Sequence, residues 1–181
     1  MFEDLISRLF HLLQRFEEFV LSTSVLSLAA LTILNVLSRG LLNRSLAFTQ
    51  ELSHFLIIII CFVGLSYATS QGRHIRMTAI YDQFGPQGRK VLMVLIAGST
   101  SLLLLVLGAY AVRYVMTVYQ LGGISPTLSV PYYLVYLIAP VGLFLSAFQY
   151  LLVVVKNLTN TGVFIAFEKT DIYDQPVSQD I

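Results

Sequence analysis

The sequence predicts an all-α integral membrane protein with four transmembrane helices and an N-terminal amphipathic interfacial helix. Of its 181 residues, 56% are hydrophobic and 12% are charged, and the mean hydropathy is +0.78. This composition is too apolar for an ordinary soluble domain. Four apolar stretches lack Asp, Glu, Lys and Arg in their central parts, and each is long enough to cross a hydrocarbon core of about 30 Å. They cover about residues 19–38, 52–70, 91–112 and 131–155.

These stretches form a single membrane domain over residues 1–155, and residues 156–181 follow as a cytoplasmic tail. Before the first span, residues of about 2–18 show the apolar spacing of one helical face, which is typical of a helix lying on a membrane surface. The apolar positions are Phe2, Leu5, Ile6, Leu9, Leu13 and Phe16. A shorter segment of the same kind runs from Ile75 to Phe84. The single cysteine, Cys61, excludes a disulfide within the chain.

The distribution of Lys and Arg predicts the orientation in the membrane. Eight of the 11 basic residues flank the spans on one side: Arg8, Arg15, Arg73, Arg76, Arg89, Lys90, Lys156 and Lys169. The other side has only Arg39, Arg44 and Arg113. The positive-inside rule therefore places both termini and the middle loop in the cytoplasm.

Small and polar residues within the spans are candidates for contacts between helices. In the first span, Asn35 carries an amide that needs a hydrogen-bonding partner in lipid. It shares one side of the helix with Ser24, Ser27 and Ser38. Gly64 and Ala68 in the second span form a small-xxx-small pair, and so do Ala97 and Ser101 in the third. We expect this polar and small-residue face to turn toward a partner protein, although serine hydroxyls also bond to their own helix.

Ionisable side chains occur near the ends of the spans. Glu51 and His54 are three residues apart at the beginning of the second span, so both project from one face of the helix. Arg39 or Arg44, across the short preceding loop, could pair with Glu51 and fix how the first two helices meet. The alternative makes Glu51 a proton-coupling carboxylate, but its position at a helix end favours the structural interpretation.

The fourth span contains two prolines with different expected effects. Pro131 lies near the first turn, where its missing N–H costs nothing, and Ser129 before it is a candidate N-cap. Pro140 lies further in, removes a backbone hydrogen bond and should bend the helix.

After the second span, Arg73, His74 and Arg76 form a basic group at the cytoplasmic edge. Such side chains bind lipid phosphates or the last carbonyls of a helix, so we expect contacts with membrane lipids or a subunit. No phosphate loop, metal-binding pattern or nucleophile elbow occurs in the sequence. We therefore expect no enzyme activity, cofactor, metal, catalytic or substrate-binding residue, and no nucleic-acid binding.

Three segments carry a resemblance to a known family. They are residues 48–54 (FTQELSH), residues 62–68 (FVGLSYA) running into 72–77 (GRHIRM), and residues 125–136 (SPTLSVPYYLVY) continuing to 139–142 (APVG). With the four spans, they resemble the small membrane subunit (DctQ type) of tripartite ATP-independent periplasmic (TRAP) transporters. Phe48 and His54 depart from the Trp and Arg that family members often have there.

The resemblance implies a location in the bacterial inner membrane and two protein partners. These are a large membrane subunit (DctM type), which works as a sodium-coupled elevator, and a periplasmic solute-binding protein (DctP type), which delivers an organic acid. The small subunit would be a fixed scaffold, in which Glu51 and the segment from Gly72 to His74 serve structure or assembly.

Two other functional classes stay open. A self-contained four-helix small exporter would need an acidic residue in the middle of a span, and the sequence has none there. A haem- or quinone-anchoring subunit would need facing histidines at similar depth, whereas His54 and His74 flank opposite ends of one span.

Overall fold

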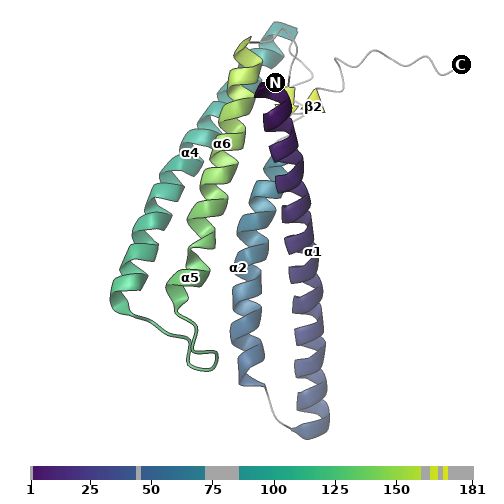
Figure 1. Ribbon diagram of the computed structural model, residues 1–181, viewed down its shortest axis with the longest axis vertical. Helices are drawn as coiled ribbons and strands as arrows, with labels where there is room; N and C mark the ends of the chain where they lie inside the picture. Colours follow the sequence, from purple (N-terminus) through teal and green to yellow (C-terminus); the bar gives the residue numbers. More distant parts are fainter. Residues whose placement is uncertain (1, 44–45, 72–85, 160–163, 167–168, 171–181) are drawn as a thin grey trace, which may run out of the picture. The chain divides into compact units, whose positions relative to one another are not determined.

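The computed structural model describes residues 2–43, 46–71, 86–159, 164–166 and 169–170. Its elements are α1 (Phe2–Leu42), α2 (Ala47–Ser70), α4 (Pro86–Leu121), α5 (Tyr132–Tyr136), α6 (Ile138–Thr159), β1 (Phe164–Ala166) and β2 (Lys169–Thr170) (Figure 1). Four segments are long and apolar enough to cross a membrane: His11–Leu41, Ala47–Ser70, Gly88–Leu121 and Tyr132–Thr159. The predicted all-α membrane fold with four spans is confirmed.

The first helix is longer than the sequence analysis anticipated. α1 continues without interruption from Phe2 to Leu42, so the expected interfacial helix and the first span are one element. The physical reason is local, because no Gly or Pro occurs between residues 2 and 39 to end the helix. A surface position for its first turns stays a prediction, and the second candidate segment, Ile75 to Phe84, lies outside the described residues.

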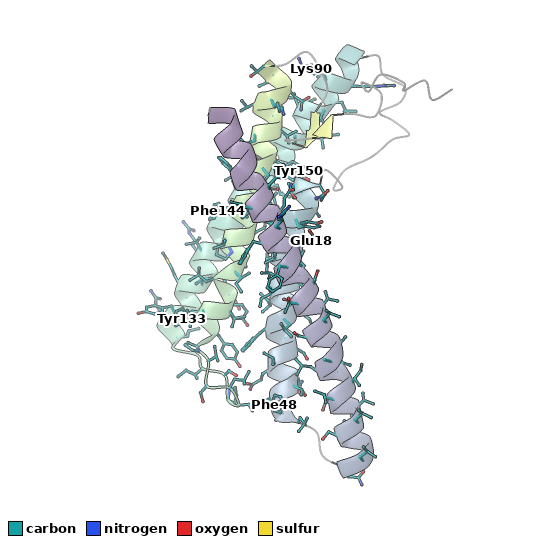
Figure 2. The ribbon with its side chains drawn as sticks, turned by 45° about the vertical axis from the view of Figure 1, so that its right-hand side comes forward. Glu18, Phe48, Lys90, Tyr133, Phe144 and Tyr150 are labelled. Carbon is teal, nitrogen blue, oxygen red and sulfur yellow. The ribbon has the colours of Figure 1, made fainter. Side chains whose placement is uncertain are left out.

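The chain packs as two compact units, of which the first contains Met1–Tyr67 and Leu107–Leu143. In this unit α1 and α2 lie side by side (Figures 1 and 2). The buried polar residues of α1 are Glu17, Ser24 and Ser38, which repeat at multiples of seven residues and therefore share one face. On α2, a Cβ atom placed at Gly64 would lie 3.6 Å from Leu21 of α1, an ordinary packing distance.

The last span of the first unit is interrupted where proline chemistry predicts. α5 ends at Tyr136, and α6 begins at Ile138 after a turn at Leu137. Pro140 has no N–H to donate to the carbonyl of Tyr136, so the helical hydrogen bonding cannot continue across this point. Ser129 is not the N-cap that the sequence suggested, because Pro131 holds that position and no side chain caps the helix.

The second unit contains Ala68–Val106 and Phe144–Ile181. Its helix α6 buries Ala147, Tyr150, Val153 and Asn157 along one face. Ser101 of α4 donates a hydrogen bond of 3.0 Å from its hydroxyl to the carbonyl of Ala147, so the small residue permits close helix packing. Beyond α6, β1 and β2 pair antiparallel.

Candidate functional site around Glu51

The connection between α4 and α5, residues 122–131, is an ordered loop held by its own backbone. Gly122 ends α4 with a φ of +62°, a left-handed conformation that glycine adopts without strain. The N–H of Ser125 donates to the carbonyl of Val130 at 2.9 Å, and the N–H of Ser129 donates to the carbonyl of Ser125 at 3.0 Å. The N–H of Tyr132 closes the loop on the carbonyl of Gly123 at 3.1 Å. These bonds present the tip of the loop in one conformation.

The carboxylate of Glu51, from the second turn of α2, binds this tip. The hydroxyl of Ser125 donates to Oε2. The N–H of Thr127 lies 3.1 Å from Oε1 and 3.2 Å from Oε2, and the N–H of Leu128 lies 3.1 Å from Oε2. Hydrogen bonds to a charged acceptor are shorter and stronger than those between neutral groups. We call these four residues the Glu51 loop site, and it joins the beginning of α2 to the loop before α5.

An open pocket of about 390 Å³ lies next to the Glu51 loop site. Its lining includes Gln50, Glu51, His54, Phe55, Thr127 and Tyr132. The rings of Phe55 and Tyr132 meet edge to face, with centroids 6.2 Å apart and an interplanar angle of 81°. Phe55 is buried, whereas Gln50, His54 and Thr127 are exposed, so the pocket has an aromatic wall and a polar rim.

Tyrosines join α4 to α5 beside the same loop. The rings of Tyr114 and Tyr136 lie 5.5 Å apart, and those of Tyr119 and Tyr133 lie 5.1 Å apart, both edge to face. Such pairs contribute about 0.5–1.5 kcal/mol beyond their burial. Figure 2 shows Tyr133 near the loop end of α5 and Phe48 near the beginning of α2.

The structure shows partners of Glu51 other than the predicted Arg39, whereas Arg44, the other predicted partner, lies outside the described residues. The described residues that donate hydrogen bonds to its carboxylate are Ser125, Thr127 and Leu128, and none of them is basic. Arg39 is exposed at the end of α1. The loop binds the carboxylate because three donors on one turn satisfy it without ordering a long arginine side chain.

The other predicted residues occupy separate places. The Oδ1 atom of Asn35 accepts the N–H of Leu46 at 3.3 Å, so this amide bonds within its own chain. His54 is on the rim of the pocket, Gly64 faces Leu21, and Pro140 is the third residue of α6. Arg44, Arg73, His74 and Arg76 lie outside the described residues.

Sequence reasoning missed a second carboxylate, Glu17 of α1. Its side chain is only 3% exposed, and its Oε1 atom accepts a hydrogen bond of 2.6 Å from the hydroxyl of Ser66 on α2. Its Oε2 atom is buried and has no hydrogen-bond partner among the described residues. Ser24 and Ser38 are 14 residues apart, which is two heptads, and a further heptad toward the N-terminus would have pointed to Glu17.

Two serines of the polar face of α1, which is expected to turn toward a partner protein, are buried within this single chain. Ser24 is 6% exposed and Ser38 is 8% exposed within this single chain. The reason is that a second helix of the same chain already supplies the close packing that small residues allow.

A second missed residue is Gly142, at the beginning of α6. A Cβ atom at this position would lie 2.6 Å from the carbonyl oxygen of Phe62 on α2, closer than real contacts allow. The two backbones therefore touch, and only glycine fits between them. The sequence does mark this position, because residues 139–142 belong to one of the three segments that resemble the DctQ family.

The four apolar helices and the hydrogen bonds that join them within the chain define a multi-pass membrane protein. The family model for the DctQ component of tripartite ATP-independent periplasmic transporters matches residues 28–160. The ectoine TRAP transporter small permease protein TeaB of Halomonas elongata is 41% identical over 162 residues, which cover 90% of this chain and 84% of the relative.

Two further relatives match shorter regions. The C4-dicarboxylate TRAP transporter small permease protein DctQ of Rhodobacter capsulatus is 27% identical over 107 residues, 59% of this chain and 47% of the relative. A putative TRAP transporter small permease protein of Haemophilus influenzae is 30% identical over 74 residues, 40% of this chain and 46% of the relative. The chain belongs to the DctQ family of TRAP transporter small permease subunits. Its relatives are transporter subunits rather than enzymes.

Proposed function

We propose that this chain is the scaffold subunit of a TRAP transporter and carries no solute by itself. It would bind a large elevator-type membrane subunit of the DctM type and stay fixed while that subunit moves a solute together with sodium ions. A periplasmic solute-binding protein of the DctP type would deliver the solute, and both termini of the chain would lie in the cytoplasm.

The observation that carries this proposal is the lack of Asp, Glu, Lys and Arg in the central part of every span. A transporter of ions or organic anions keeps ionisable groups at that depth, because they bind or relay the cargo. The two carboxylates with hydrogen bonds lie away from the centres of the spans, Glu17 near the beginning of His11–Leu41 and Glu51 in the second turn of α2. Both are bound by groups of the same chain. A sodium or solute path would therefore lie in the large subunit.

The names of the relatives bear on the cargo. The Rhodobacter capsulatus relative serves a C4-dicarboxylate transporter, and the Halomonas elongata relative serves an ectoine transporter. We propose an organic acid as the solute, and the 41% identity to the second of these relatives supports ectoine as a second candidate. Both solutes carry a carboxylate.

Reconstitution tests the scaffold proposal. The full chain is purified from native membranes and placed in proteoliposomes alone, and in parallel with the large subunit, the solute-binding protein and a sodium gradient. We expect copurification with a large membrane protein, and uptake of radiolabelled solute only in the complete system. Uptake by this chain alone would overturn the proposal, and so would full activity of the large subunit without it.

A further inference from the structure

We propose that the pocket beside the Glu51 loop site receives a lysine or arginine side chain of a water-soluble protein on the extracytoplasmic side of the membrane. The inference rests on the proposed function for the orientation of the chain. It adds an interaction surface, and it states the chemistry of the group that the surface binds.

The charge balance of the site favours a cation. Glu51 carries a full negative charge, and the groups bound to it are a hydroxyl and two N–H groups, which are neutral. The beginning of α2 adds a positive partial charge of only about half a unit. Arg113, a basic residue of α4, lies over the ring of Tyr110, 6.0 Å from its centroid, and is not among the residues that act on the Glu51 carboxylate. The site therefore keeps a net negative charge without a basic partner among the described residues.

The shape and lining of the pocket fit one long basic side chain. A volume of about 390 Å³ is near the lower end of the range of about 300–1,000 Å³ that ligand pockets occupy. The aromatic wall of Phe55 and Tyr132 suits the methylene stem and the cationic head of lysine or arginine. The exposed amide of Gln50 and imidazole of His54 stand at the rim, where they add hydrogen bonds.

The surroundings of the pocket indicate a water-soluble protein rather than lipid or a membrane helix. Its rim is polar, unlike the leucine-rich surface of α4, where Leu102 is 65% exposed and Leu103 is 59% exposed. The loop that carries Thr127 also exposes the apolar side chain of Ile124, to 60%. An apolar anchor beside a charged pocket with a polar rim is typical of an interface between soluble surfaces.

Crosslinking in whole cells identifies the occupant. A photoreactive amino acid replaces Gln50 in the full chain, and a matched control carries it at Leu103 on the exposed surface of α4. We expect an adduct from position 50 with a soluble extracytoplasmic protein, and mass spectrometry should place the linked peptide beside a lysine or arginine. An adduct with a membrane subunit instead, or no adduct at all, would overturn the proposal.

Charge exchange tests the chemistry. Glu51→Gln should weaken the adduct roughly five- to tenfold at low salt, because it removes the charge. Ser125→Ala removes one bond of the same site but keeps the charge, so its adduct should fall less than about threefold. Glu51→Lys should abolish the adduct, and replacing the identified basic residue of the partner by Glu should restore it.

Two outcomes of these variants count against the pocket. Equal losses for Glu51→Gln and Ser125→Ala would assign the effect to the fold of the loop and overturn the charge argument, as would failure of the exchanged pair. The scaffold proposal fails separately, because copurification with a large subunit does not depend on the adduct.

Discussion

Glu17 and Glu51 are the same type of side chain in two different surroundings. Glu51 is held by three donors of a loop and borders an open pocket. Glu17 is 3% exposed, accepts one hydrogen bond from Ser66, and keeps one oxygen without a partner among the described residues. A buried carboxyl that makes only part of its possible hydrogen bonds lowers the stability of the fold. Removing the hydroxyl of Ser66 alone should therefore destabilise the chain more than removing Ser66 and the carboxyl of Glu17 together.

The change Ser66→Ala tests this asymmetry. Loss of the hydroxyl leaves the carboxyl of Glu17 buried without its donor, and we expect a destabilisation of about 1–3 kcal/mol. The double change Ser66→Ala with Glu17→Leu should recover most of this loss, because both polar groups are gone. Thermal unfolding of the purified chain in detergent measures the difference, with Tm expected to fall by about 2–4 °C for each kcal/mol.

Ser99→Ala is the matched control for this prediction. The hydroxyl of Ser99 is exposed and donates to the carbonyl of Ile96 in its own helix at 3.0 Å. Its loss should change the free energy of unfolding by less than about 0.5 kcal/mol. A double variant that is less stable than Ser66→Ala alone would contradict the interpretation of Glu17 as an underbonded group.

Residue partners were the least predictable part of the sequence. The position of Glu51 at a helix end favours a structural role, and Arg39 and Arg44 are candidate partners because they are near in sequence and opposite in charge. The actual donors, Ser125, Thr127 and Leu128, come from a loop more than 70 residues away. Two of the donors are backbone N–H groups, which every residue type except proline provides, so no sequence pattern marks them.

Among the elements, each predicted apolar segment lies, to within about a residue, inside a described helical span, although α1 and α4 extend beyond theirs, and the interruptions follow proline and glycine. The turn at Leu137 precedes Pro140, and α4 ends before Gly122. What local sequence could not predict is where two helices touch. Phe62 and Gly142 are 80 residues apart, and their contact depends on how α2 and α6 approach within the first unit.

Gly142→Ala tests that contact. The added methyl group would lie 2.6 Å from the backbone oxygen of Phe62, which cannot rotate away as a side chain could. The helices must separate, and overpacking of this kind costs about 1–3 kcal/mol. Thermal unfolding in detergent should therefore show a lower Tm for this variant.

Gly98→Ala supplies the comparison, because a Cβ atom there would meet nothing within 4 Å. Alanine favours a helix over glycine by about 1 kcal/mol, so this variant should be as stable as the parent or slightly more stable. If both glycine variants lose stability equally, the loss would come from the helix itself and not from its contact with α2.

For the whole molecule, composition and hydropathy predicted the class and the number of spans, because the bilayer sets a length that apolar segments must match. Orientation has a different physical basis. Eight of the 11 Lys and Arg residues flank the spans on one side, and the positive-inside rule converts this asymmetry into a direction. The rule predicts that the Glu51 loop site lies on the extracytoplasmic side of the membrane and the end of α6 on the cytoplasmic side.

Labelling of introduced cysteines tests this orientation. In a chain with Cys61→Ser, cysteine replaces either Thr127, which is exposed on the loop, or Thr159, which is exposed at the end of α6. A membrane-impermeant maleimide added to right-side-out spheroplasts should label position 127, and it should label position 159 only after permeabilisation. The two positions should differ because they lie on opposite sides of the membrane. The segments rich in Lys and Arg, which include the end of α6, stay in the cytoplasm because their translocation is unfavourable. Labelling of position 159 in intact spheroplasts, with position 127 protected, would invert the chain and place the Glu51 pocket in the cytoplasm.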